Sequence, residues 1–309
     1  MQLDMHALST RRQLLHAAGG AGVTALATLA GCTVTSDYDH TGSDAPRFDA
    51  AHIKPARVAW VLSSGGPRGF VHVGVLKALN ELQLKPDLVV GGSVGALVGA
   101  LYACGMPVAQ MEVMSLELGL MDMGRLAVGG EARFNGGPIA EFINRELRGL
   151  PIEQLKTRFA AAVVERNSRK ALLFNAGNAG LAVQASSAIE GTMTPVRIRG
   201  MQFVDADLAT PMPVRLARGL GALRVLAVDA SAHEDKAPAG TERYRAGDLR
   251  KRALTQADTK EANMTLHPDF GYYVNASREF RLRAIRAGYE HTLAHAQELR
   301  ALHAAHSLT

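Results

Sequence analysis

One serine in this sequence lies at the centre of a glycine pattern typical of a catalytic nucleophile. Gly91, Gly92, Ser93, Val94 and Gly95 match G-x-S-x-G. In that pattern a strand turns abruptly into a helix, and small residues at the first and last positions leave room for a serine with an exposed hydroxyl. The dipole of the helix favours negative charge near the serine. We therefore predict that Ser93 is a nucleophile and that Gly91 and Gly95 form its elbow; the alternative is a tight turn with a structural serine.

A second glycine-rich stretch, SSGGPRG at 63–69, offers groups that would stabilise an oxyanion. Neighbouring glycines let backbone N–H groups approach a tetrahedral oxygen closely, and Arg68 adds a fixed positive charge. We expect Gly65, Gly66 and Arg68 to line the oxyanion hole. The alternative is a phosphate-binding loop, but the stretch lacks the Lys-Ser/Thr ending of a P-loop and the spacing of a dinucleotide-binding loop.

A candidate base follows later, at the end of the predicted strand MQFVD at 201–205. Loops at the carboxyl ends of parallel strands lie at one edge of a sheet, so Asp205 and Ser93 can meet there. A Ser–Asp–His triad is the alternative arrangement. Its histidine would follow Asp205 in the chain and would be His233 or His267.

The stretches that carry these residues alternate between predicted strands and helices. The apolar patterns predict strands at 57–62, 88–90, 159–164, 171–174, 201–205 and 223–231, and helices at 70–82, 94–105, 138–147, 181–189 and 277–306. Residues 233–260 are polar and charged, and we expect a long surface excursion there, part of it flexible. The alternation predicts an α/β fold with a parallel sheet and helices on both of its faces.

The N-terminal residues predict export and lipid anchoring. Arg11 and Arg12 resemble the start of a twin-arginine export signal. The 15 uncharged residues at 17–31 are fewer than the roughly 20 that span a bilayer, and they fit the apolar core of a signal peptide. LAGC at 29–32 resembles a bacterial lipobox, which implies that Cys32 is diacylated and becomes the first residue of the mature protein.

This pattern divides the chain into three expected parts: a signal peptide at 1–31, an acylated cysteine with a flexible tether at 32–55, and a single domain at 56–309. Two acyl chains anchor a protein stably to a membrane. We therefore expect a lipid-anchored protein of a bacterial cell that faces the periplasm. Thr33 directly after the cysteine mildly favours the outer membrane.

Composition excludes several classes of protein. A hydrophobic content of 47% and a charged content of 20% are ordinary for a globular chain. The net charge of +5 is small, and the arginines at 278–286 are not interleaved with aromatic residues, so we expect no nucleic-acid partner. The two cysteines and the histidines lack the spacing of a zinc site, and we expect neither a metal nor a cofactor.

Three ordered motifs together resemble the bacterial patatin-like phospholipase family. LSSGGPRGFVHVGVLKAL at 62–79 resembles the glycine-rich block, GGSVGALVGALYACG at 91–105 the nucleophile elbow, and residues 185–214 the aspartate block. The similarity extends over residues 57–231. It implies a three-layer α/β/α fold with a mostly parallel central sheet and a Ser–Asp dyad without a catalytic histidine. Ser93 would be the nucleophile, Asp205 the general base, and Gly65, Gly66 and Arg68 the oxyanion hole.

The sequence departs from the family pattern near the predicted base. Ala206 and then Asp207 follow Asp205, where the family usually has glycine directly after the aspartate. Alanine there would strain a backbone that needs glycine, and a second carboxylate would raise the pKa of Asp205. Ser64 replaces a common glycine and Glu190 a common proline. These departures leave room for a slow or lapsed enzyme.

The predicted function is a lipid acyl hydrolase that acts on membrane phospholipids or other acyl esters through an acyl-enzyme. One alternative is a Ser–Asp–His esterase or thioesterase for soluble substrates. Another is a lipoprotein that binds lipid without catalysis. A dyad without histidine further predicts that the pH–rate profile has no limb near the ordinary histidine pKa of about 6.5.

Overall fold

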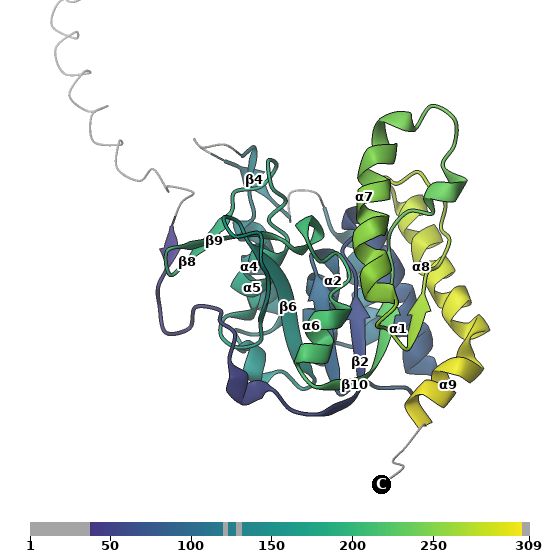
Figure 1. Ribbon diagram of the computed structural model, residues 1–309, viewed down its shortest axis with the longest axis horizontal. Coiled ribbons are helices and arrows are strands. Elements are labelled where there is room, and N and C mark those ends of the chain that lie inside the picture. Colours follow the sequence, from purple (N-terminus) through teal and green to yellow (C-terminus); the bar gives the residue numbers. More distant parts are fainter. Residues whose placement is uncertain (1–37, 120–122, 128–131, 305–309) are drawn as a thin grey trace, which may run out of the picture.

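The computed structural model describes residues 38–119, 123–127 and 132–304. Within these residues a nine-stranded sheet has the order β1-β8-β9-β6-β3-β2-β10-β11, with β7 also paired to β6 (Figure 1). The strands are β1 (Asp39–His40), β2 (Ala56–Leu62), β3 (Leu88–Gly92), β6 (Arg158–Glu165), β7 (Ala171–Phe174), β8 (Val196–Ile198), β9 (Met201–Asp205), β10 (Ala222–Val228) and β11 (Met264–Leu266). A separate antiparallel pair joins β4 (Arg125–Leu126) to β5 (Phe134–Asn135).

The centre of the sheet is parallel. β6, β3, β2, β10 and β11 all run in one direction. β7 and β9 are antiparallel to β6, and β8 is antiparallel to β9. The carboxyl ends of the parallel strands therefore share one edge, where the loops after them converge.

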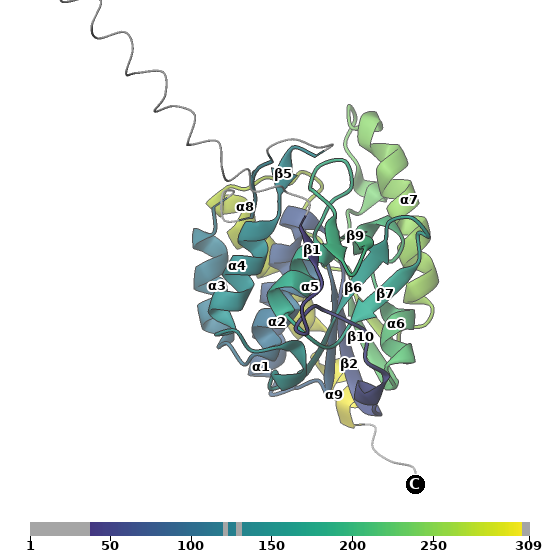
Figure 2. The same cartoon turned by 90° about the vertical axis from the view of Figure 1, so that its left-hand side faces the viewer.

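Helices cover both faces of the sheet and make three layers (Figure 2). One layer contains α1 (Phe70–Glu81), α2 (Val94–Ala103), α3 (Val108–Glu117), α4 (Gly137–Glu146), α5 (Ala179–Ser186), α8 (Arg278–Ala294) and α9 (Ala296–Ala304). The other contains α6 (Val214–Gly219) and α7 (Glu242–Thr259). The fold is thus the predicted three-layer α/β/α arrangement with a mostly parallel sheet.

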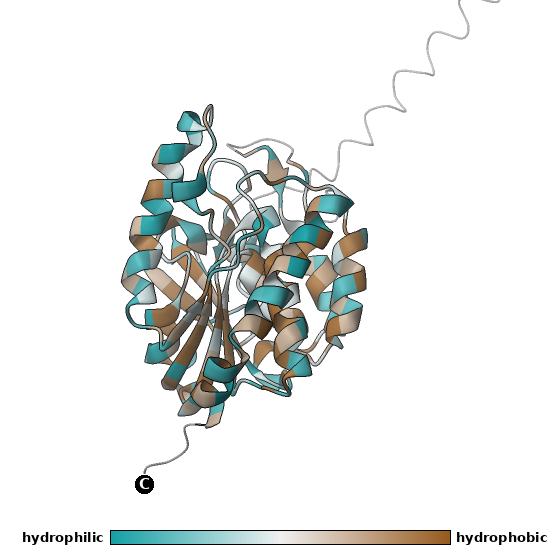
Figure 3. Cartoon of the chain, turned by 90° about the vertical axis from the view of Figure 1, so that its right-hand side faces the viewer, coloured by the Kyte–Doolittle hydropathy of each residue, from teal (hydrophilic) through white to brown (hydrophobic). Residues whose placement is uncertain are grey.

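Successive residues of the central strands enter two different cores. In β2, Trp60 and Leu62 pack in the core on the α1 side, whereas Ala59 and Val61 pack in the core on the α6 side. A strand buried on both faces needs apolar residues at nearly every position. Figure 3 accordingly shows brown, apolar strands between helices with teal outer faces.

The helical regions differ from the sequence-based prediction in several places. No helix was predicted where α3 and α6 lie. Residues 233–260, expected to be a partly flexible excursion, contain the 18-residue helix α7. Its buried residues are Thr255 and Asp258, so it has no apolar stripe that a helical period would reveal. The single helix predicted at 277–306 is divided at His295 into α8 and α9.

Part of the expected tether packs on the domain. Asp39 and His40 of β1 pair with β8, and the Asp49 N–H donates to Asn175 Oδ1 at 2.7 Å. Residues 38–55 therefore belong to the folded body, which begins earlier than the predicted boundary at residue 56. The predicted signal peptide and Cys32, the predicted site of acylation, lie outside the described residues. No helix among the described residues is long and apolar enough to cross a membrane.

Candidate active site

The nucleophile elbow forms where β3 ends and α2 begins. Ser93 has φ 52° and ψ −123°, a backbone conformation that a non-glycine residue rarely adopts. A Cβ on Gly91 would lie 2.3 Å from the Gly95 carbonyl oxygen, and a Cβ on Gly95 would lie 2.1 Å from the Leu62 carbonyl oxygen. Both positions exclude a side chain, as the G-x-S-x-G pattern predicted, and Ser93 stands at the corner.

A serine on α5 holds the strained corner in place. The Ser93 N–H donates to Ser186 Oγ at 2.9 Å, and Ser186 Oγ in turn donates to the Ala162 carbonyl at 2.6 Å. These contacts fix the elbow to both β6 and α5. Sequence reasoning did not single out Ser186, although it lies in the stretch that resembles the family's aspartate block.

Ser93 and Asp205 are brought together as the sequence predicted. Ser93 Oγ donates to Asp205 Oδ2 at 2.7 Å. Ser93 is 6% exposed and Asp205 is 4% exposed. Asp205 ends β9, whose neighbour β6 lies directly beside β3 in the sheet. A hydroxyl that donates to a buried carboxylate has the geometry of a nucleophile with its general base.

Burial raises the pKa of Asp205 to about 7, because the ionised carboxylate loses its hydration. Hydrogen bonds from Ser93 Oγ and the Asp207 N–H oppose the rise, the charge of Asp207 adds to it, and Lys251 opposes it. A base with a pKa near neutrality is well suited to proton transfer near pH 7. The acidic limb of the activity would then lie close to the histidine value, so the predicted absence of such a limb does not distinguish a dyad from a triad.

Ala206 does not strain the aspartate loop. Its φ is negative, since it is not among the non-glycine residues with positive φ. It begins the 3₁₀ helix η5 (Ala206–Leu208), and Asp205 caps that helix by accepting from the Asp207 N–H at 2.7 Å. Ala206 is fully buried in the core on the α6 side. The suggestion that glycine would relieve strain here was wrong, because the backbone is one that alanine adopts readily.

Asp207 carries a charge that is compensated from α7. Lys251 Nζ lies 2.6 Å from Asp207 Oδ1, and Ser64 Oγ also donates to that oxygen. The Asp207 side chain is 46% exposed, so burial raises its pKa only in part. The attraction to Lys251 and these hydrogen bonds outweigh that effect, and the pKa lies below its usual value. Lys251 was not recognised in the sequence because nothing in its local surroundings marks it. Glu190, the residue found where the family commonly has proline, forms ion pairs with Arg166 and Arg169.

The glycine-rich loop forms a short 3₁₀ helix, η2 (Gly66–Gly69), beside the elbow. Gly66 has φ 53° and lines the same pocket as Ser93. Gly65 packs against Ala230, where an added Cβ would lie 3.1 Å from the alanine side chain. The Arg68 guanidinium does not line the pocket and donates to the Tyr272 carbonyl at 3.4 Å. The loop therefore offers Gly66 at the site, whereas the side chain of Arg68 points to the loop before α8.

His233 and His267, the histidines considered for a triad, contact each other and not the Ser93–Asp205 pair. The His233 and His267 rings stack 3.8 Å apart, and His267 Nε2 lies 3.2 Å from the Ser231 carbonyl. Neither ring is hydrogen-bonded to Ser93 or Asp205, whose carboxylate accepts from Ser93 and the Asp207 N–H. His72 is buried against the Ser63 carbonyl at 2.8 Å, and burial lowers its pKa to about 4.

Ser93 lines a pocket of about 340 Å³. Aliphatic and aromatic side chains make up most of its wall. They come from α1, α2, α4 and β5, from Leu118 and Met123, and from the loop at 189–193. Polar groups include Ser93, Ser187 and the buried Arg281. An apolar pocket with one reactive hydroxyl fits an alkyl or acyl chain whose carbonyl lies at Ser93.

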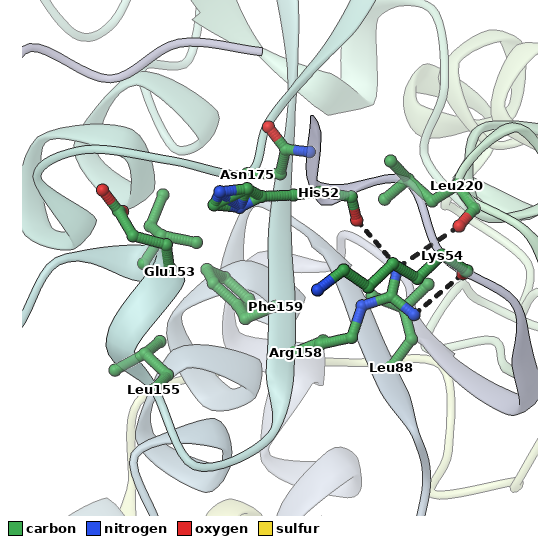
Figure 4. A pocket seen from close by; sticks show the side chains of 10 residues that line it. His52, Lys54, Leu88, Glu153, Leu155, Arg158, Phe159, Asn175 and Leu220 are labelled. Carbon is green, nitrogen blue, oxygen red and sulfur yellow. Dashed lines mark hydrogen bonds between the residues drawn. The ribbon is translucent and has the colours of Figure 1, made fainter. Parts of the chain in front are cut away.

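A second pocket lies at the amino ends of the parallel strands, where Leu88 begins β3 and Arg158 begins β6. Figure 4 shows the side chains that line it. It has a volume of about 110 Å³. The two terminal nitrogens of Arg158 donate to four backbone carbonyls, those of His52, Lys54, Pro55 and Leu220, at 2.9–3.4 Å. This pocket closes the amino-terminal edge of the sheet and holds no nucleophile beside a base. Among the described residues no group of three or more His, Cys, Asp or Glu side chains is placed to hold a metal ion.

Comparison with known proteins identifies a family for this chain. Residues 60–218, just over half of the chain, match the family model of the patatin-like phospholipases. The chain belongs to the patatin-like phospholipase family.

Relatives of this chain come from bacteria, fungi and animals. An uncharacterised NTE family protein of Mycobacterium tuberculosis (strain ATCC 25618 / H37Rv) is 30% identical over 183 residues, which cover 58% of this chain and 50% of the relative. The lysophospholipase NTE1 of Coccidioides immitis (strain RS) is 30% identical over 196 residues, which cover 59% of this chain and 12% of the relative. The chain thus spans half or less of the length of these relatives.

The fold is also similar to a solved structure. The crystal structure of VipD from Legionella pneumophila matches with a TM-score of 0.54 at 13% identity, covering 87% of this chain and 72% of that chain. This similarity extends the shared architecture beyond the residues that the family model covers.

Proposed function

We propose that this protein is a serine-dependent lipid acyl hydrolase that uses Ser93 and Asp205 as a catalytic dyad. One observation carries the proposal: Ser93 lines an apolar pocket, and its Oγ donates to the buried Asp205 carboxylate at 2.7 Å. The membership of the chain in the patatin-like phospholipase family supports lipid esters as the substrate class. The lysophospholipase name of a relative points in the same direction.

In the proposed reaction Asp205 Oδ2 takes the proton from Ser93 Oγ as the oxygen attacks the ester carbonyl. The negative charge moves to the carbonyl oxygen, where backbone N–H groups around Gly66 and the amino end of α2 would stabilise it. The protonated Asp205 then gives its proton to the leaving alcohol, and an acyl-Ser93 ester remains. Asp205 next removes a proton from water, which attacks the acyl ester; the fatty acid leaves and Ser93 recovers its proton.

A fluorophosphonate probe tests the nucleophile directly. We expect mass spectrometry to find the adduct on Ser93, and Ser93→Ala to abolish both labelling and hydrolysis of phospholipids and short acyl esters. Ser187 is the matched control, because it lines the same pocket and its hydroxyl has no hydrogen-bond partner in the described chain. Ser187→Ala should still be labelled. An adduct on any residue other than Ser93, or Ser93→Ala activity above a tenth of the parent's, would refute the assignment.

The position of Arg281 in the pocket leads us to propose phospholipids, rather than neutral acylglycerols, as the substrates. This cation is 8% exposed, lines the pocket and donates to two neutral carbonyls, those of Ser115 and Ala276. A buried cation with neutral partners attracts an anionic group such as a phosphodiester. We expect Arg281→Gln to lower kcat/KM about tenfold or more for a phospholipid and less than about threefold for a neutral acyl ester. Equal losses on both substrates would contradict this preference.

We also propose that Cys32 anchors the mature protein to a bacterial membrane, with the domain facing the periplasm. The order of paired arginines, apolar stretch and LAGC supports this proposal. Cys32→Ser should prevent acylation and release the protein from the membrane fraction after export. A serine variant that stays firmly in the membrane fraction would overturn the anchor.

A further inference from the structure

Helix α7 reaches the candidate active site through one lysine. α7 is exposed along most of its length and lies on the α6 side of the sheet (Figure 1). The side chain of Lys251 is 19% exposed. Its ammonium lies 2.6 Å from Asp207 Oδ1, 3.1 Å from Ser64 Oγ and 3.2 Å from the Ser64 carbonyl. One cation therefore contacts both the aspartate loop and the start of the glycine-rich loop.

Asp207 connects this cation to the candidate base. The Asp207 N–H donates to Asp205 Oδ1 at 2.7 Å, so the two carboxylates belong to one short turn. A second negative charge so close to a buried carboxylate makes ionisation of that carboxylate less favourable. A cation on Asp207 opposes this effect, and it also holds the Asp207 side chain toward Ser64 and α7.

We propose that Lys251 is a positioning residue for the dyad, which compensates the charge of Asp207 and so keeps Asp205 ionised, and therefore active as a base, near neutral pH. The inference depends on the proposed function of Ser93 and Asp205. The charged groups acting on Asp205 are Asp207 from η5 and Lys251 from α7, and Arg250 of α7 acts on Asp207. The negative charge of Asp207 raises the pKa of Asp205, and the positive charge of Lys251 lowers it.

The alternative is that Lys251 serves only to hold α7 on the domain. Other ion pairs also make that attachment: Arg215 of α6 lies 3.0 Å from the buried Asp258, and Arg252 pairs with Glu234. Arg252 is the matched control, since it is adjacent to Lys251 on the same helix and its ion pair lies outside the dyad. A structural role predicts the same loss at every pH, whereas a positioning role predicts a shift of the pH profile.

The test compares pH–rate profiles of kcat/KM for the full chain and its variants. Lys251→Met should move the acidic limb up by about one pH unit or more, which lowers activity about tenfold below the limb and leaves the alkaline plateau nearly unchanged. Asp207→Asn should move the limb down, because Lys251 is then uncompensated. The double variant should return the limb toward the parent position, Lys251→Arg should preserve it, and Arg252→Met should leave it unmoved.

NMR titration of the Asp205 carboxyl separates a failure of this inference from a failure of the proposed function. The titration is followed in the Ser93→Ala background and needs no turnover, so it tests the charge coupling even if the protein proves inactive. The carboxyl should titrate at higher pH in Lys251→Met and at lower pH in Asp207→Asn. Equal titration in the parent and Lys251→Met, or an equal loss of kcat/KM at every pH, would overturn the role of Lys251. Asp207→Asn and Lys251→Arg test the same coupling if Lys251→Met does not fold.

Discussion

The two ends of the parallel sheet use polar groups in opposite ways. At the carboxyl edge, the Ser93 hydroxyl donates a hydrogen bond to the buried Asp205 carboxylate, and burial raises the pKa of that carboxyl to about 7. At the amino edge, Arg158 donates to four backbone carbonyls and closes the chain around a small pocket. The Ser93 hydroxyl has a carboxylate that can take its proton, whereas the partly exposed Arg158 donates to neutral carbonyls and stabilises the chain segments that carry them.

The largest effect should come from the base. Asp205→Asn keeps the shape of the side chain but cannot accept the Ser93 proton, so we expect kcat/KM to fall at least a thousandfold. Ester hydrolysis at pH 8 measures this. Arg158→Met is the comparison at the other edge. Residual Asp205→Asn activity within tenfold of the parent would mean that another group acts as the base.

The pH dependence should follow the raised pKa of Asp205. The base must be ionised, so kcat/KM should be constant above about pH 7 and fall about tenfold per pH unit below it. A profile measured from pH 5 to 9 with a neutral ester tests this. An acidic limb near 4, the ordinary value for an aspartate, would show that Asp205 is not buried as the structure has it.

Arg158→Met should change stability rather than catalysis. Loss of the guanidinium leaves the carbonyls of the His52–Pro55 segment without their donor, and we expect the free energy of unfolding to fall by about 1–3 kcal/mol. Urea unfolding measures the fall, and kcat/KM of the folded variant should stay within about threefold of the parent. A hundredfold loss of kcat/KM with unchanged stability would remove the contrast between the two edges.

The stacked histidines should matter little for turnover. His233→Ala and His267→Ala should each lower kcat/KM less than about tenfold, or about 1.4 kcal/mol of barrier, since neither ring is hydrogen-bonded to Ser93 or Asp205. Because Asp205 itself should titrate near the histidine value, these variants distinguish a dyad from a triad better than the pH profile does. A thousandfold loss in either folded variant would favour the triad.

The smallest effect should come from Ala206. Its backbone is unstrained and its methyl group is buried, so Ala206→Gly should lower the free energy of unfolding by about 1 kcal/mol and leave kcat/KM within about threefold. Thermal unfolding and ester hydrolysis measure the two quantities. A tenfold gain in activity would revive the idea that alanine strains the aspartate loop.

The elbow and the central strands could be predicted from the amino-acid sequence, and the resemblance to the family implied that Asp205 pairs with Ser93. The elbow can be predicted because a side chain at Gly91 or Gly95 would collide with nearby backbone. The central strands can be predicted because strands buried on both faces consist of continuous apolar runs.

The electrostatics of the site depend on contacts between residues that are far apart in the chain. Lys251 lies 187 residues after Ser64 in the chain yet contacts it, on a polar helix whose period carries no signal. Burial likewise raises the pKa of Asp205, and burial exists only after the layers have packed. Local steric constraints depend on residues that are neighbours in the chain. Desolvation and long-range charge pairing depend on which distant residues the fold brings together.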